Sequence, residues 1–327
     1  NMCGIVGYIG QGQAQPILLN CLEKLEYRGY DSCGIAVLGQ GVKVYKDKVR
    51  VGELARMLPE VKGKLGIGHT RWATHGEPSQ INAHPHCDCS GNITVVHNGI
   101  ITNYRSLRQK LIAEGHNFVS ETDTEVIPHL IEGYYEGNLE KAVETALNNV
   151  EGSYAIIVLM ANEPKLVAAK KDSPLIIGLG DRAYFVASDV PAILDYTDRV
   201  IFLEDGDSAV ITENNLSITR EGKTVTRQEH KVAWTVQDAQ KGGYAHFMLK
   251  EIHEQPRVIR DTLGEYISLT EPIADLTDTS GTPLPGLFLV ACGTSYHAAL
   301  MGKYIFGELV GIPVRVELAS EFNYGRQ

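Results

Sequence analysis

Residues 153–188 read SYAIIVLMANEPKLVAAKKDSPLIIGLGDRAYFVAS, and this stretch decides the fold class of the chain. Apolar runs of strand length follow one another here and continue to residue 219, separated by turn residues such as Asn162-Glu163-Pro164. Connections this short favour antiparallel pairing, because a parallel crossover needs a dozen or more residues. The sequence therefore predicts antiparallel strands at 154–161, 165–170, 174–179, 183–187, 199–203, 207–212 and 215–219.

The part of the chain before this stretch adds further strands and two blocks of helix. Residues 3–10, CGIVGYIG, are predicted to form a buried strand, and apolar residues recur at helical spacing over 15–27. Further strands are predicted at 33–38, 42–46, 65–72 and 92–97, and further helices at 104–114, 124–135 and 139–149. Residues 1–230 are therefore predicted to form an α/β domain with mainly antiparallel sheets.

A second unit is predicted near the C-terminal end. Residues 228–245 are polar and suggest a linker, and a helix is predicted over 245–263, where Pro256 implies a kink or a division into two helices. A loop at 277–286 then precedes a strand at 287–291, a helix at 296–310 and a strand at 313–317, as at the start of a parallel α/β domain. About 40 residues are too few for an independent core, so we expect the chain to stop inside this second domain.

Composition excludes several classes of protein. The chain has 327 residues, 43% of them hydrophobic and 21% charged, as in a typical globular protein with room for two domains. The net charge of −10 argues against a general nucleic-acid binder, which would carry a basic stripe. The chain contains no run of about 18 apolar residues, so the sequence predicts no membrane-spanning helix. Six cysteines are too few for a disulfide scaffold and no secretory signal is visible, so we expect a cytoplasmic protein.

Cys3 is the first candidate for chemistry. It leads a predicted strand near the start of the chain and is followed by Gly4. A thiolate there can attack a carbonyl while an α-amine at the chain start, which titrates near pH 8, takes and returns the proton. The pair Cys-Gly alone fits a small buried cysteine equally well.

Three further motifs offer groups that bind charge. Arg71 can clamp a carboxylate with two parallel hydrogen bonds, and Trp72 beside it can form the wall of a pocket. Asn98 and the backbone amide of Gly99 can donate to the oxyanion of a tetrahedral intermediate. Asp123 can bind an ammonium group. Taken singly, each motif also fits a structural role: a structural arginine with a core tryptophan, an Asn-Gly hairpin turn, and an acidic helix cap.

The order of these motifs resembles one family closely. CGIVGYIG, LEYRGYDS, HTRWATHGEPS, NAHPH, HNGI and SETDTE follow one another as in the glutaminase domain of the class II glutamine amidotransferases, which are N-terminal-nucleophile hydrolases. The later segments YAHFMLKEIHEQP and LVACGTSYHA narrow the resemblance to the glucosamine-6-phosphate synthase family. The resemblance covers nearly the whole chain. It implies a four-layer αββα sandwich over residues 1–240, a linker and helical segment over 241–286, and the opening βαβ unit of a sugar isomerase (SIS) domain over 287–327.

The resemblance also implies roles for individual residues. Cys3 would attack the side-chain amide of L-glutamine, and Asn98 and Gly99 would hold the oxyanion. Arg71 would clamp the α-carboxylate of the substrate and Asp123 its α-ammonium. The remaining implied positions are Trp72, Thr74, His75 and Gly76 at the glutamine pocket, with Trp72 gating ammonia, and Arg28, Tyr30 and Asp31 in a loop that supports the nucleophile.

The predicted turn Cys292-Gly293-Thr294-Ser295 resembles a phosphate-gripping loop. Backbone N–H groups and hydroxyls at a helix start bind phosphate well, although a simple Ser/Thr helix cap has the same sequence. By resemblance the acceptor is fructose 6-phosphate and the product glucosamine 6-phosphate, with no metal or organic cofactor and with the full-length protein a homodimer. The remaining phosphate contacts and the isomerase base of the family would lie beyond residue 327.

Two features depart from the family pattern. Asn1 and Met2 precede Cys3, so the predicted nucleophile lacks a free α-amine in this chain; Met2 would then be the natural start and Asn1 a remnant. The hexapeptide at 84–89, His-Pro-His-Cys-Asp-Cys, contains four residues of types that bind zinc. Ligation by such adjacent residues is sterically poor, so we predict no metal site there.

Two other functions remain open. Another class II amidotransferase, of the phosphoribosyl-pyrophosphate type, would require a phosphoribosyltransferase loop after residue 240, and the turn at 292–295 argues against it. A non-catalytic sugar-phosphate sensor with an inactive glutaminase fold would not release glutamate from glutamine.

Overall fold

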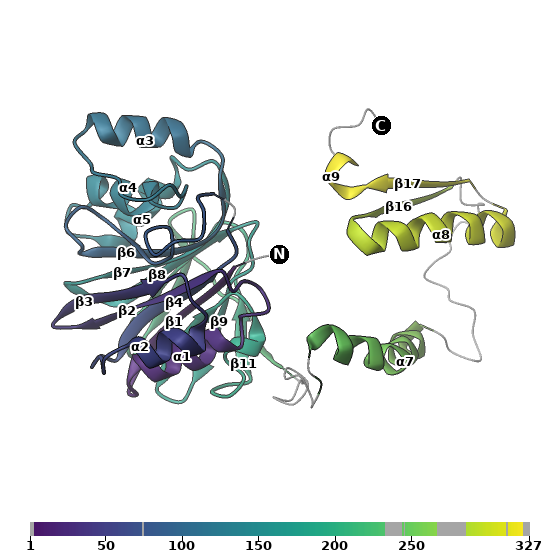
Figure 1. Cartoon of the computed structure of the whole chain (residues 1–327), viewed down its shortest axis with the longest axis horizontal. Helices are drawn as coiled ribbons and strands as arrows, with labels where there is room; N and C mark the ends of the chain where they lie inside the picture. Colours follow the sequence, from purple (N-terminus) through teal and green to yellow (C-terminus); the bar gives the residue numbers. More distant parts are fainter. Residues whose placement is uncertain are drawn as a thin grey trace. The chain divides into compact units, whose positions relative to one another are not determined.

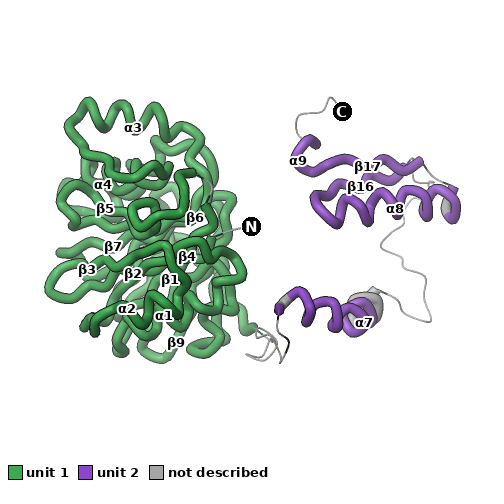
Figure 2. Tube along the Cα trace, in the orientation of Figure 1, with its two compact units in different colours: residues 1–240 green, residues 241–327 purple. Residues whose placement is uncertain are grey.

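The computed structural model describes residues 3–73, 75–232, 244, 246–266, 286–311 and 313–322. The chain divides into two compact units, residues 1–240 and 241–327, which Figure 2 colours separately. The helices in these described ranges include none that is long and apolar enough to cross a bilayer.

The first unit contains two antiparallel sheets with helices on their outer faces (Figure 1). The eight-stranded sheet has the order β15-β11-β9-β10-β1-β4-β2-β3, and the seven-stranded sheet has the order β14-β13-β12-β8-β7-β6-β5. Every neighbouring pair in both sheets is antiparallel, as the short connections predict.

The strands and helices of this unit have the following bounds. The first sheet comprises β1 (Gly4–Gly10), β2 (Ser32–Gly39), β3 (Gly41–Asp47), β4 (Leu65–Arg71), β9 (Ile176–Gly180), β10 (Ala183–Ala187), β11 (Arg199–Phe202) and β15 (Glu229–Lys231). The second sheet comprises β5 (His86–Cys87), β6 (Ile93–Ile101), β7 (Gly152–Met160), β8 (Glu163–Lys171), β12 (Asp207–Ile211), β13 (Leu216–Arg220) and β14 (Lys223–Thr224). The helices are α1 (Ala14–Glu23), α2 (Val51–Met57), α3 (Tyr104–Ala113), α4 (Val126–Tyr134), α5 (Leu139–Leu147) and the 3-10 turn Val190–Ala192.

Alternate residues of the central strands face two different cores. In β1, Val6 and Tyr8 pack in the core beneath α1, whereas Ile5 and Ile9 pack in the core between the two sheets. The same alternation in β7 directs one face toward the core under α3, α4 and α5 and the other toward the space between the sheets. Because side chains of a strand alternate with a period of two, a strand without polar positions is buried on both faces. The predicted four-layer αββα sandwich is confirmed.

The second unit contains α7 (Phe247–Tyr266) and a βαβ element. Strands β16 (Leu287–Ala291) and β17 (Val314–Leu318) pair in parallel, with α8 (Gly293–Val310) between them in sequence and α9 (Ala319–Phe322) after them. The predicted parallel unit is therefore present. The helix over 247–266 is continuous and contains Pro256, so the division into two helices is wrong.

Several predicted boundaries differ from the structure. Helix α1 ends at Glu23 instead of residue 27, because the chain continues there in turns in which Leu25 and Arg28 donate to carbonyls three residues earlier. Helix α8 begins at Gly293, three residues before its predicted start. Sequence reasoning missed α2 and the short strands β5, β14 and β15. The predicted loop at 277–285 and most of the linker at 228–245 lie outside the described residues.

Candidate active site

A cavity of about 230 Å³ in the first unit brings together residues that are far apart in sequence. It is lined by the start of β1, the ends of β4 and β6, and the segment that precedes α4. Six predicted site residues line it, namely Cys3, Arg71, Trp72, Asn98, Gly99 and Asp123. The fold therefore brings together, around one space, the residues predicted to act as nucleophile, as oxyanion donors and as substrate-binding charges.

Cys3 stands at the head of β1, the central strand of the eight-stranded sheet. Its Sγ accepts a hydrogen bond from the backbone N of Trp72 at 3.2 Å and lies 3.4 Å from the Trp72 carbonyl oxygen. Burial raises the pKa of the Cys3 thiol, and the Trp72 N–H and the Arg71 and Arg28 charges only partly oppose this effect. The thiol is therefore held protonated at neutral pH, so its use as a nucleophile requires a base.

Asn98 is positioned by two groups from the first sheet. Its Nδ2 donates to the Cys3 carbonyl oxygen at 2.8 Å, and its Oδ1 lies 3.1 Å from Nε2 of His69. The same His69 nitrogen lies 3.0 Å from the His97 carbonyl oxygen. Because both oxygens near His69 Nε2 accept hydrogen bonds, this nitrogen carries the ring proton and donates it. The Oδ1 of Asn98 therefore faces His69, and its NH₂ group faces Cys3.

Gly99 occupies a position where no other residue fits. Its φ is +134°, and a Cβ built there would lie 2.1 Å from the carbonyl oxygen of Ser153 on the neighbouring strand β7. The absence of a side chain lets β6 approach β7 while the chain bends at the cavity.

Arg71 ends strand β4 and is almost fully buried. Its Nη2 donates to the carbonyl oxygens of His75 and, at 2.9 Å, of Gly76. Its Nη1 is buried and has no hydrogen-bond partner among the residues that the structure describes. A buried donor without a partner is costly, so Nη1 of Arg71 offers a binding position for an anionic group in the cavity.

Asp123 provides the opposite charge at the cavity. Its Oδ2 accepts a hydrogen bond from the backbone N of Ile101 at 2.8 Å, which fixes the carboxylate, and its Oδ1 lies 4.0 Å from Nδ1 of His75. The alternative interpretation of this segment, an acidic helix cap, is not observed at α4, because Glu125 is the N-cap residue and makes no side-chain capping bond. Glu125 instead accepts hydrogen bonds from Val119 and Ser120.

The loop at 28–31 lies against the start of β1. Arg28 donates from Nε to the Cys3 carbonyl oxygen at 3.2 Å and pairs through Nη1 with Asp189 at 2.7 Å. Asp31 accepts from the backbone N of Ala73 at 2.9 Å, and the Tyr30 ring meets the edge of Trp72 with centroids 5.6 Å apart. These contacts hold the segment that supplies the Trp72 N–H to the Cys3 sulfur.

The other predicted site residues lie outside the cavity lining. His75 and Gly76 are next to it and contact Arg71 through their carbonyl oxygens. Thr74 lies outside the described residues. Residues 292–295 form the start of α8 in the second unit, where Cys292 is the N-cap residue and Gly293 has a φ of +59°.

A group of buried histidines under the cavity was not predicted. The rings of His69 and His84 stack with centroids 4.0 Å apart, and His84 meets His86 at 4.6 Å. Two of these histidines also contact one hydroxyl: Thr124 Oγ1 lies 2.9 Å from His84 Nε2 and 2.8 Å from His97 Nδ1. Burial lowers the pKa of His69 to about 3 and lowers the pKa values of the other three imidazoles. These histidines are therefore neutral and shape the cavity instead of serving as bases.

Other cavity-lining residues also escaped sequence reasoning. They are Ile100, Thr122, Thr124, Ser153, Ser173 and Pro174, besides His84 and His97. His97, Thr122 and Thr124 belong to the quoted motifs HNGI and SETDTE, so the motifs contained a signal for them. Ser173 and Pro174 lie in the loop after β8, and no motif marked them.

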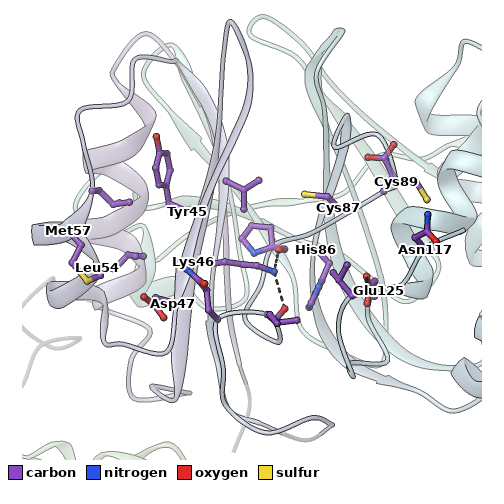
Figure 3. A pocket seen from close by; sticks show the side chains of 17 residues that line it. Tyr45, Lys46, Asp47, Leu54, Met57, His86, Cys87, Cys89, Asn117 and Glu125 are labelled. Atoms are coloured by element: carbon purple, nitrogen blue, oxygen red, sulfur yellow. Dashed lines mark hydrogen bonds between the residues drawn. The ribbon is translucent and has the colours of Figure 1, made fainter.

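A larger pocket of about 660 Å³ lies elsewhere in the first unit and holds none of the predicted site residues. Figure 3 shows Lys46 in its centre, with hydrogen bonds to surrounding carbonyl oxygens. The Lys46 Nζ donates to the carbonyls of Ile81, Ala83 and Pro85, and burial lowers its pKa to about 8. Three carbonyl acceptors satisfy all three N–H groups, so Lys46 fastens the 81–85 loop and is not free for a ligand.

Comparison with known proteins agrees with this geometry. A family model described as a glutamine amidotransferase domain matches residues 69–195, and a model described as a SIS domain matches residues 286–326. Fold, cavity and family model together define the first unit as a glutamine amidotransferase domain.

Curated relatives identify the particular family. A glutamine--fructose-6-phosphate aminotransferase [isomerizing] from Clostridium tetani is 52% identical over 99% of this chain, and one from Methanothermobacter thermautotrophicus is also 52% identical over 99% of it. The chain belongs to the glutamine--fructose-6-phosphate aminotransferase family. It spans 55% of the length of each of these two relatives.

Solved structures support the fold. The glutamine phosphoribosylpyrophosphate amidotransferase from B. subtilis, complexed with ADP and GMP, superimposes with a TM-score of 0.62 at 23% sequence identity, covering 96% of this chain and 65% of that one. A second structure, described as the allosteric regulatory enzyme of purine biosynthesis, gives 0.60 at the same identity. At this identity the likeness concerns the fold, which is that of an N-terminal-nucleophile hydrolase.

Proposed function

We propose that the first unit hydrolyses L-glutamine through a thioester on Cys3 and supplies ammonia for the conversion of fructose 6-phosphate to glucosamine 6-phosphate. The observation that carries the proposal is the 230 Å³ cavity, in which a thiol faces Arg71 and Asp123. A free amino acid has a carboxylate and an ammonium group, and these two opposite charges suit it.

The proposed chemistry follows from the positions of the groups. The Cys3 sulfur attacks the side-chain amide carbon of glutamine, and the thiol proton passes through an α-amine on Cys3 to the departing nitrogen, which leaves as ammonia. Water then attacks the thioester, which yields glutamate and restores the thiol. The second Nδ2–H of Asn98 and the N–H of Gly99 are the proposed donors to both tetrahedral intermediates. Such donors contribute about 3–4 kcal/mol each in comparable sites.

Substrate binding is assigned to the opposite charges of Arg71 and Asp123. Nη1 of Arg71, for which the described residues provide no hydrogen-bond partner, is proposed to bind the α-carboxylate, and Oδ1 of Asp123 the α-ammonium. Thr74, His75 and Gly76 are proposed to complete the glutamine pocket, and Trp72 to gate the passage of ammonia.

The acceptor half of the reaction is proposed for the second unit. The helix start at Gly293, with the hydroxyls of Thr294 and Ser295 in its first turn, presents backbone N–H groups of the kind that bind phosphate. We therefore assign residues 292–295 to the phosphate of fructose 6-phosphate. The division into 1–240, 241–286 and 287–327, a cytoplasmic location and a homodimer of the full-length protein remain predictions.

Labelling with a diazo-ketone glutamine analogue tests the glutaminase proposal. We expect intact-mass analysis to find one adduct per chain on Cys3 in protein whose first residue is Cys3, and the same protein to release glutamate from glutamine. Cys33→Ser is the matched control, because Cys33 is buried in β2 outside the cavity, whereas Cys3→Ala loses both signals.

The two residues before Cys3 provide a second comparison. Protein that retains Asn1 and Met2 has no α-amine on Cys3, so we expect it to label and to hydrolyse glutamine far more slowly than protein that starts at Cys3. Equal rates would overturn the role of the α-amine. An absence of adduct in protein that starts at Cys3 would overturn the glutaminase proposal and favour the sugar-phosphate sensor.

A further inference from the structure

Four metal-binding side chains converge at a place that the proposed glutaminase does not use. They are Cys89 in the turn after β5, His116 in the turn after α3, and His129 and Glu132 on α4. One donor atom of each lies within 4.8 Å of the donor atoms of the other three. Three segments separated in sequence thus direct sulfur, nitrogen and oxygen donors at one point.

Of four distances between these donor atoms, three lie within about 0.1 Å of the edges of a zinc tetrahedron, whereas the distance from Glu132 to His116 is shorter and has the length of a hydrogen bond. The Cys89 Sγ lies 3.5 Å from Nδ1 of His116 and 3.5 Å from Nδ1 of His129. Oε2 of Glu132 lies 2.9 Å from Nδ1 of His116 and 3.5 Å from Nδ1 of His129. With Zn–S near 2.3 Å and Zn–N and Zn–O near 2.1 Å, a tetrahedron has S–N edges of about 3.6 Å and N–O edges of about 3.4 Å.

A carboxylate stands behind one of the histidines. His129 is almost fully buried, and its Nε2, on the side of the ring away from the cluster, faces Oε1 of Glu125 at 3.9 Å. Glu125 is itself fixed by hydrogen bonds from Val119 and Ser120. At 3.9 Å this contact is an ion pair and not a hydrogen bond, but it places the Glu125 carboxylate on the side of the ring where metal-binding histidines commonly have one.

We propose that Cys89, His116, His129 and Glu132 bind one Zn²⁺ ion. A thiolate, two imidazoles and a carboxylate suit a borderline-soft cation that prefers four ligands, whereas Mg²⁺ and Ca²⁺ take oxygen ligands. Four protein ligands leave no open position for substrate, so the ion is structural. It ties the turn after β5 and the end of α3 to α4.

This site differs from the hexapeptide that the sequence singled out. His84 and His86 turn inward to Thr124 and Thr122, and Cys87 Sγ lies 3.6 Å from Thr94 Oγ1. Figure 3 shows the sulfurs of Cys87 and Cys89 pointing in different directions, that of Cys89 toward Asn117. The adjacent residues therefore do not form a site among themselves, and Cys89 joins partners that are distant in sequence.

Zinc analysis of the whole chain tests the proposal. Protein supplied with zinc sulfate and then dialysed is expected to retain one zinc per chain, and Cys89→Ser and His116→Ala to weaken zinc affinity by more than about 100-fold, beyond the loss typical of an outer-shell change. Cys87→Ser is the matched control, because Cys87 lies two residues away and outside the cluster; it should retain the ion. Replacement of zinc by Co²⁺ should give tetrahedral d–d bands and a thiolate charge-transfer band that Cys89→Ser removes.

The alternative is a cluster held by protons alone, in which the thiol and imidazole N–H groups donate to Glu132. That arrangement predicts less than one tenth of a zinc per chain and no thiolate band with Co²⁺, and either result would overturn the proposal. Equal loss of zinc in Cys87→Ser and Cys89→Ser would also overturn it. None of these measurements involves glutamine, so the zinc proposal and the glutaminase proposal fail or succeed separately.

Discussion

The guanidinium of Arg71 is unevenly hydrogen-bonded, because Nη2 donates to two backbone carbonyls while Nη1 has no partner in the described part of the chain. A lysine has one ammonium group and cannot both hold the 75–76 carbonyls and bind a carboxylate in parallel. We therefore expect Arg71→Lys to raise KM for glutamine by about 10- to 100-fold, which corresponds to a lost charged hydrogen bond of about 1.5–3 kcal/mol.

Steady-state glutamate release measures this effect. Arg105→Lys is the matched control, since Arg105 is exposed on α3 and contacts the Tyr104 ring. A normal KM in Arg71→Lys would contradict the assigned carboxylate contact.

At the scale of an element, strand β6 depends on the glycine at its bend. Ala in place of Gly99 would need a φ of +134° and would meet the Ser153 carbonyl. We expect Gly99→Ala to lower the free energy of unfolding by more than about 2 kcal/mol and to abolish glutamate release. Chemical denaturation followed by circular dichroism gives the first quantity.

Gly41 provides the matched control for this substitution. Its φ of +121° is similar, but a Cβ there meets nothing within 4 Å. Gly41→Ala should therefore cost only the backbone strain, about 1 kcal/mol, and leave activity intact. If Gly99→Ala and Gly41→Ala lower the free energy of unfolding equally, the close approach of β6 to β7 does not contribute to stability.

Most elements could be predicted because their burial leaves a pattern in sequence. The core strands of both sheets are continuous apolar runs of strand length, and their short connections decide the pairing direction. Helix α2 was missed because its seven residues include Gly52 and have too few turns to show a period. The strands β5, β14 and β15 were missed because two or three residues carry no pattern, and their pairing depends on neighbours elsewhere in the fold.

At the scale of the whole molecule, the buried histidines make stability depend on pH. The folded-state pKa of His69, about 3, lies below the usual 6.5, so the folded protein binds fewer protons than the unfolded chain between these values. Stability is therefore fully present above pH 6.5 and is lost as pH falls toward 3. At pH 5 the loss from His69 alone is about 2 kcal/mol, and the lowered pKa values of His84, His86 and His97 act in the same direction.

The thermal midpoint measured between pH 8 and pH 5 tests this dependence. We expect a steep fall below pH 6.5, which His86→Asn makes shallower. His230→Asn, which removes an exposed histidine, should leave the slope unchanged. A midpoint that stays constant down to pH 5 would contradict the expected loss.

The candidate site could be predicted only in part, for a physical reason. The charged and nucleophilic residues occur in motifs whose order resembles a family, so Cys3, Arg71 and Asp123 were named from sequence. The cavity walls come from the packing of two sheets, and loop residues such as Ser173 enter it through the course of the chain after β8. The proposed metal site likewise depends on the course of the chain, which brings Cys89 next to residues on α4. Because these residues are far apart in sequence, no local spacing could indicate the site.

The place of β1 between β4 and β10 has a consequence for protein synthesis. The ribosome makes β1 well before its neighbour β10, which ends at Ala187, whereas β1 ends at Gly10. At about 5–20 residues per second, the interval is on the order of ten seconds or more. Throughout that time the Cys3 thiol lies outside any finished cavity. The cavity around Cys3 is therefore completed only after β10 has been synthesised and inserted beside β1.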